Sequence, residues 1–143
     1  MIALPERSNP TLEFAARELR AYLKTLVGTR GKIVRGVREV ERRIVLGTAA
    51  SSEIISELSN EKILESCDID VFEISSDDSK VVLAGSNNRS VLYAVYALLE
   101  RLGCLWLTPW EERIPKRKSK LRIDVNETEK AGLKNRIWYQ EGT

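Results

Sequence analysis

The chain has 143 residues, of which 43% are hydrophobic and 31% are charged, a balance typical of one folded domain rather than a disordered chain. Its formal net charge of +2 is too small to indicate a polyanionic partner, and the absence of histidine excludes Ser-His-Asp and Cys-His nucleophiles and the usual zinc sites. Cys67 and Cys104 match neither a metal-ligand nor a redox spacing. We therefore expect no metal and no cofactor. We expect the two thiols to be buried, and a single disulfide between them is the alternative.

The sequence carries no sign of a membrane segment or a secretory signal. No apolar run approaches the roughly 20 residues that span a bilayer, and the start, MIALPER, lacks the charged-then-apolar order of a signal peptide. No membrane partner is expected, and the compartment is left open.

The first third of the chain predicts a strand, a helix and a second strand. The run IALP (2–5) indicates a short strand that Pro5 stops. Asn9 and Pro10 form a good helix start, apolar residues then recur at helical spacing, and Gly28 is placed to end the helix. The β-branched run RRIVLGT (42–48) predicts a buried strand, so these elements favour a parallel βαβ crossover.

A short helix and a hairpin are expected next. Ser51 or Ser52 can cap a helix that carries Ile54, Ile55 and Leu58. Strands 71–75 and 80–84 flank the turn 76–79. Its two aspartates, at 77 and 78, are interpreted as parts of a solvated turn rather than as a metal or acid pair, because nothing nearby supplies further ligands.

The last part of the chain predicts a helix and two strands. The helix runs from about 89 to 102 with a wide apolar face, KLRIDV (120–125) alternates like a strand, and 136–139 is one more strand with nothing after it. We therefore expect an accessory domain over 1–128, followed in 129–143 by a linker and the start of a downstream domain.

The segment from 85 to 109 carries a resemblance to a known family. The residues that carry it, in identity and in spacing, are Gly85, Asn87, Arg89, Tyr93, Ala94, Tyr96, Leu98, Leu99, Glu100, Leu102, Gly103, Trp106 and Pro109. In these residues the chain resembles the non-catalytic domain that precedes the barrel in β-N-acetylhexosaminidases, α-glucuronidases and related glycoside hydrolases. Ser90 departs from the glycine that these domains usually carry.

This resemblance implies the fold and the function. It implies an α+β two-layer sandwich, a mixed sheet of about four or five strands with about three helices packed on it. It also implies that the chain is an accessory domain of a carbohydrate-active hydrolase, packed against a downstream catalytic (β/α)8 barrel of the same polypeptide. The carbohydrate substrate would then be a partner only through the parent enzyme, whose catalytic carboxyl groups have no counterpart here.

The tryptophans and one acidic pair are the side chains that suggest carbohydrate chemistry. Glu111 and Glu112 are adjacent, and neighbouring side chains of an extended segment point to opposite faces, so we do not expect them to act on one glycosidic bond. Trp106, Trp110 and Trp138 are candidates for sugar contact or for contact between domains. Packing is favoured for Trp106 and a domain seam for Trp110.

The polar turn before the third helix is a second candidate site. Ser86, Asn87, Asn88 and Arg89 lie at a helix N-terminus, where an anion can bind. The turn contains one glycine rather than the several that let backbone amides surround a phosphate, so helix capping is favoured over anion binding.

Two basic stretches, 30–43 and 113–120, support a different hypothesis. They contain no aromatic residue for base stacking, so a solvated loop or strand edge is favoured and nucleic acid is an improbable partner. A small nucleic-acid-binding domain and an independent carbohydrate-binding module stay open as alternatives to the accessory domain.

Overall fold

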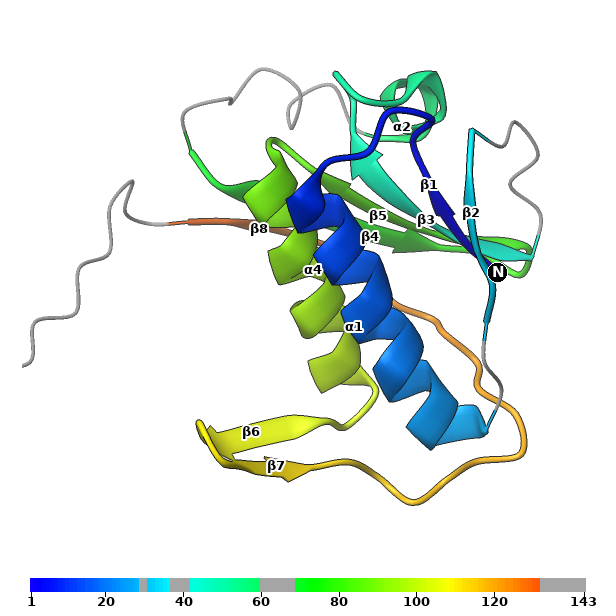
Figure 1. Cartoon of the computed structure of the whole chain (residues 1–143), viewed down its shortest axis with the longest axis vertical. Coiled ribbons are helices and arrows are strands. Elements are labelled where there is room, and N and C mark those ends of the chain that lie inside the picture. Colours follow the sequence, from blue (N-terminus) through cyan, green and yellow to red (C-terminus); the bar gives the residue numbers. More distant parts are fainter. Residues whose placement is uncertain (29–30, 37–41, 60–68, 132–143) are drawn as a thin grey trace, which may run out of the picture.

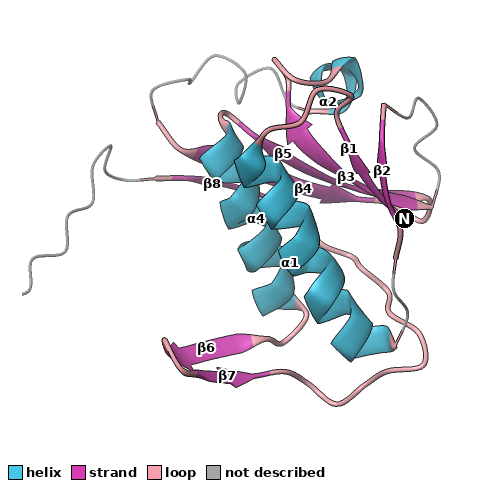
Figure 2. Ribbon diagram, in the orientation of Figure 1, coloured by secondary structure: helices cyan, strands magenta, loops and turns pink. Residues whose placement is uncertain are grey.

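The computed structural model describes residues 1–28, 31–36, 42–59 and 69–131. They form a mixed sheet with two long helices on one face, together with a separate two-stranded hairpin (Figures 1 and 2). The described elements are, in chain order, β1 (Ile2–Leu4), α1 (Pro10–Val27), β2 (Ile33–Arg35), β3 (Arg43–Thr48), α2 (Glu53–Leu58), β4 (Val71–Ser76), β5 (Lys80–Gly85), α4 (Asn88–Arg101), β6 (Leu105–Thr108), β7 (Glu111–Arg113) and β8 (Glu127–Lys130).

The main sheet has six strands in the order β2-β1-β3-β5-β4-β8. Strands β2, β1, β3 and β5 run parallel, whereas β4 is antiparallel to both β5 and β8. Helix α1 connects β1 to β2 and helix α4 follows β5, as expected for parallel strands that need crossover connections. The predicted α+β sandwich with a mixed sheet is confirmed, with six strands where about four or five were expected.

Helices α1 and α4 lie side by side across one face of the sheet (Figure 1). Helix α1 begins as predicted, since the Asn9 side chain accepts a hydrogen bond from the backbone of Leu12 and Pro10 opens the first turn. It ends at Gly28 in the left-handed conformation, with φ of 76°. The apolar sides of both helices pack onto the sheet and form the main core with it.

The opposite face of the sheet carries a smaller apolar cluster. Ala3, Val45, Val82 and Ala84 point away from the long helices and pack with Ile55 of the short helix α2. Ser52 caps α2 by accepting a hydrogen bond from the backbone of Ile55 at 3.4 Å. The third helix of the predicted set therefore covers the other side of the sheet.

The prediction of a strand at 120–125 is wrong. Its alternating residues do turn inward, because Ile123 and Val125 pack on the main core. The backbone, however, bonds to side chains instead of a neighbouring strand: Val125 donates to the Ser76 hydroxyl and accepts from it, at 2.8 and 3.0 Å. The sixth strand is β8, which starts at Glu127 and pairs with β4.

Two further elements were not expected, β2 and the hairpin β6–β7. The hairpin directly follows α4, where the sequence predicted no strand, and lies beyond the end of that helix (Figure 1). The strand predicted at 136–139 lies outside the described residues, as does Cys67. Among the described helices, none is long and apolar enough to cross a membrane.

Candidate functional site

The polar turn before α4 is bound to a carboxylate of the chain itself. Asn87 is the N-cap of α4, and its side-chain oxygen accepts from the backbone of Ser90 at 3.0 Å while its nitrogen donates to Asp70 at 2.8 Å. Arg89 forms an ion pair with Asp70 at 2.9 Å. Asp70 thus already uses the side-chain donors that this turn could offer to a bound anion.

The surroundings of Asp70 stabilise its charged form. Partial burial alone would raise the pKa of this carboxyl group, but the hydrogen bonds from Asn87, Arg89 and Ser90 outweigh burial and hold its pKa below the usual value. The hydroxyl of Ser90 contributes one of these bonds, at 3.2 Å. Ser90, the one departure from the resemblance noted in the sequence, therefore has a role as a donor to Asp70.

Ser86 and Gly85 tie the same turn to the sheet. The Ser86 hydroxyl donates to the backbone of Ile69 at 2.8 Å and accepts from the backbone of Val71 at 3.1 Å. A Cβ atom on Gly85 would lie 2.6 Å from the backbone nitrogen of Val91, so only glycine lets β5 approach the helix this closely. Asn88 is the first residue of α4.

Trp106 is held in an aromatic cluster between the two long helices and the hairpin. Its ring stands edge-on to Tyr22 and Tyr96, with ring centroids 5.6 and 5.0 Å away. Its indole nitrogen donates to the Tyr22 hydroxyl at 2.8 Å, and the Tyr96 hydroxyl donates to Glu18 at 2.8 Å. Burial, followed by the neighbouring Glu18 carboxylate, raises the pKa of Tyr96.

The two glutamates of the hairpin differ in what they contact. Tyr22 donates a hydrogen bond to Glu112, and burial together with this carboxylate raises the pKa of Tyr22. Glu111 neighbours it on β7 and is exposed. The structure gives no bond that joins the two carboxyl groups, and no group of three His, Cys, Asp or Glu side chains in the described ranges is arranged to hold a metal ion.

The outer side of the hairpin carries exposed apolar side chains. Trp110, at the turn, is 91% exposed, while Leu105 and Leu107 on β6 are 51% and 49% exposed. Because side chains alternate along a strand, Leu105 and Leu107 face away from Trp106 and the helices. We call these three side chains the hairpin patch. Trp138, the third candidate tryptophan, lies outside the described residues.

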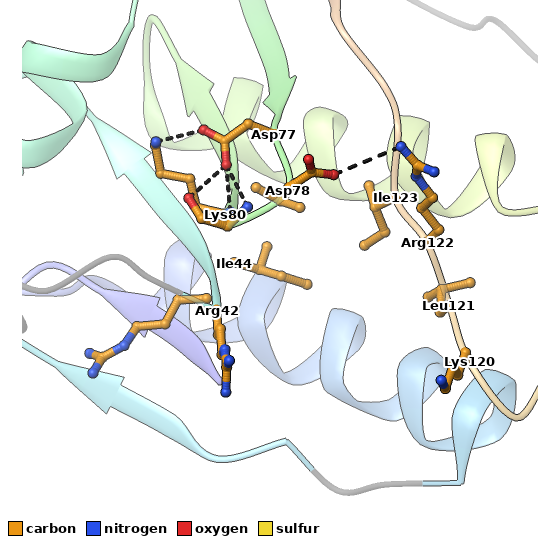
Figure 3. Close-up of a pocket in the computed structure, with 12 residues that line it drawn as sticks. Arg42, Ile44, Asp77, Asp78, Lys80, Lys120, Leu121, Arg122 and Ile123 are labelled. Atoms are coloured by element: carbon orange, nitrogen blue, oxygen red, sulfur yellow. Dashed lines mark hydrogen bonds and ion pairs between the residues drawn. The ribbon is translucent and has the colours of Figure 1, made fainter.

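The structure also brings parts of the two basic stretches together, which sequence patterns did not reveal. Arg42 and Arg43 come from one stretch and Lys120 ends the other, and all three line one cavity of about 540 Å³ (Figure 3). The remaining cations of this cavity are Lys80 and Arg122. The clustering of positive residues was visible in the sequence, but the 76 residues between Arg43 and Lys120 hid their proximity.

Comparison with known proteins identifies the fold. A solved structure of a family GH115 4-O-methyl-α-glucuronidase with specificity for decorated arabinogalactans matches with a TM-score of 0.61 and 21% identity, over 89% of this chain and 17% of that chain. A GH138 enzyme targeting pectin rhamnogalacturonan II matches with a TM-score of 0.45 and 16% identity, over 71% of this chain and 10% of that chain. No curated protein sequence gives a significant match.

The chain therefore spans less than a fifth of the length of the glucuronidase structure. The family model described as the N-terminus of glycosyl hydrolase family 67 matches residues 2–98, more than half of the chain. That range contains β1 to β5 and nearly all of α4, the elements that form the core and the Asp70 turn. The chain belongs to the family of glycosyl hydrolase family 67 N-terminal domains.

Proposed function

We propose that this chain is a non-catalytic accessory domain of an α-glucuronidase-type glycoside hydrolase, docked through the hairpin patch onto a downstream catalytic barrel. The observation that carries this proposal is the exposure of Leu105, Leu107 and Trp110 on a hairpin whose inner side is firmly packed. Exposed apolar side chains that gather in one place favour a protein contact. The division after residue 128 remains a prediction.

The occupant that best suits the patch is the rest of the same polypeptide. Family membership and the small share of the glucuronidase structure that this fold represents both support a larger parent protein. A covalently attached domain is present at high effective concentration, so it needs less contact area than a separate partner.

The arrangement of acidic side chains supports the absence of catalysis. Glycoside hydrolysis needs two carboxyl groups about 5 to 10 Å apart across a sugar-binding cleft. Glu112 is bound by Tyr22, and Asp70 is bound by three side chains of the α4 turn, so both have structural partners. We expect the purified chain to release no product from aryl glycosides.

Oxidative footprinting of the parent polypeptide and of this chain tests the docking. We expect Trp110 and Leu107 to be modified severalfold more slowly in the parent, whereas the packed Trp106 reacts equally slowly in both. Equal modification of Trp110 in the two proteins would contradict docking through the patch. Turnover of an aryl glycoside by the isolated chain, abolished by Glu112→Gln, would contradict the non-catalytic assignment.

A carbohydrate-binding module is the main alternative, because an exposed tryptophan also stacks on sugars. Titration of the isolated chain with neutral oligosaccharides, followed by tryptophan fluorescence, separates the two. A saturable change that disappears in Trp110→Ser would favour the module, and an unchanged spectrum is expected for a docking patch.

A further inference from the structure

The cavity at the amino ends of β3 and β5 has a positively charged rim and an apolar floor (Figure 3). Five cationic and two acidic side chains line it, so its net charge is positive although the whole chain is nearly neutral. The floor is made by Ile44, Val81 and Ile123, which belong to the main core or pack against it. At about 540 Å³ the cavity has the size of a small-molecule site.

The two aspartates of the cavity neutralise only part of the positive charge. Asp77 accepts from Lys80 at 2.7 Å and from the backbone and hydroxyl of Ser79, and these bonds lower its pKa. Asp78 is fully exposed and lies 3.8 Å from Arg122, a weak contact in water. The turn 76–79, interpreted from the sequence as merely solvated, thus forms one wall of the cavity.

The other three cations have no acidic partner among the described residues. Arg42, Arg43 and Lys120 form no recorded ion pair there. The Nε atom of Arg43 is buried and has no hydrogen-bond partner within the described part of the chain. A buried donor without an acceptor is costly, so the Arg43 guanidinium is incompletely satisfied by the described residues.

We infer that this cavity binds an acidic saccharide, with a uronate carboxylate among the cations and the ring face on the apolar floor. A guanidinium group such as that of Arg43 matches a carboxylate in geometry and charge. A pyranose ring also presents C–H groups, which suit the aliphatic floor. The choice of a saccharide over other carboxylates rests on the proposed role in a carbohydrate-active enzyme.

Phosphate and nucleic acid suit the cavity less well. Its described lining contains no glycine and no residue of a helix N-terminus, the usual sources of backbone amides for a phosphate. Arg113, Lys116 and Arg117, which would extend a track for a nucleic-acid backbone, do not line it.

Binding of trigalacturonate to the isolated chain, followed by the amide NMR signals of Lys80 and Ile123, tests the inference. We expect a dissociation constant of about 1 mM, at least tenfold weaker binding of the uncharged methyl ester, and weakening by salt. The double variant Lys120→Ala/Arg122→Ala removes two exposed charges and should weaken binding about tenfold. Arg43→Met, which keeps the aliphatic stem, should weaken it at least as much.

The matched control is Arg17→Ala/Arg20→Ala, which removes two exposed charges of α1 outside the cavity and should leave binding unchanged. Three results would each overturn the inference: equal binding of the acid and its ester, no signal change at either amide, or equal binding by the cavity variants. Tighter binding of inorganic phosphate or of a single-stranded oligonucleotide would overturn it in favour of those ligands. None of these results affects the footprint at Trp110, so the docking proposal is judged separately.

Discussion

The helix layer of α1 and α4 and the hairpin β6–β7, which directly follows α4 in the chain, use their apolar side chains in opposite ways. Leu19 of α1 and Leu98 of α4 are 0% exposed, because each helix turns its apolar side to the sheet. On the hairpin Trp106 and its cross-strand partner Glu112 turn inward, and the leucines on either side of Trp106 are half exposed. The domain therefore completes its own core without the outer side of the hairpin, which is free for a partner.

Truncation of the helix layer should have the largest effect. Leu98→Ala removes a fully buried side chain from α4 and should lower the free energy of unfolding by about 2 to 5 kcal/mol. Phe14→Ala on α1, where the ring is 41% exposed, is the control and should lower the free energy of unfolding by clearly less. Urea unfolding measures both, and equal losses would show that the helix layer is not the closed core described here.

Loss of the Asp70 charge should have the next largest effect. Asp70→Asn keeps the size of the side chain but removes the ion pair with Arg89, and should cost about 1 to 2 kcal/mol at pH 7. Because the folded pKa of Asp70 lies below the unfolded value of about 3.9, its stabilisation is present above that pH and disappears as the pH falls through the folded pKa. The difference between the two proteins should therefore shrink below about pH 4, and a constant difference down to pH 2 would contradict this assignment.

Matched changes within the hairpin should have the smallest effects and compare its two sides directly. Trp106→Phe keeps a ring but loses the hydrogen bond to Tyr22, which should cost about 1 kcal/mol. Trp110→Phe should change the stability of the isolated chain by less than about 0.5 kcal/mol, because this ring is 91% exposed. Thermal unfolding measures both, and a larger loss for Trp110 would mean that the hairpin patch supports the domain itself.

Most of the fold was predictable where local signals and packing agree. The cap at Asn9, the stop at Gly28 and the hairpin of β4 and β5 follow from residues that are close in sequence. The prediction of a strand at 120–125 failed because the alternation of apolar and polar residues indicates which side chains face the core but not which backbone groups pair. There, the Ser76 side chain provides the bonds that a neighbouring strand would have formed.

The candidate sites were predictable only in part, because they depend on residues far apart in the chain. The turn at 86–89 was recognised as a helix start, but its partner Asp70 lies 17 residues before Asn87 and carries no local signal. The basic cavity is formed by two stretches that are far apart in the sequence. They come close because residues 120–123 run along the sheet, and the sequence pattern had assigned this segment to a strand. Exposure of Trp110 could not be deduced from composition.

The Tyr22 hydroxyl connects three elements, because it accepts from Trp106 on β6 and donates to Glu112 on β7 while its own backbone belongs to α1. The hairpin is thereby fixed in orientation before any second surface arrives. Association through Trp110 would then require little loss of conformational entropy on this side of the contact, which removes one of the free-energy costs of association. Tyr22→Phe would leave the surface chemistry unchanged and yet slow or weaken assembly, by allowing the hairpin to sample other orientations.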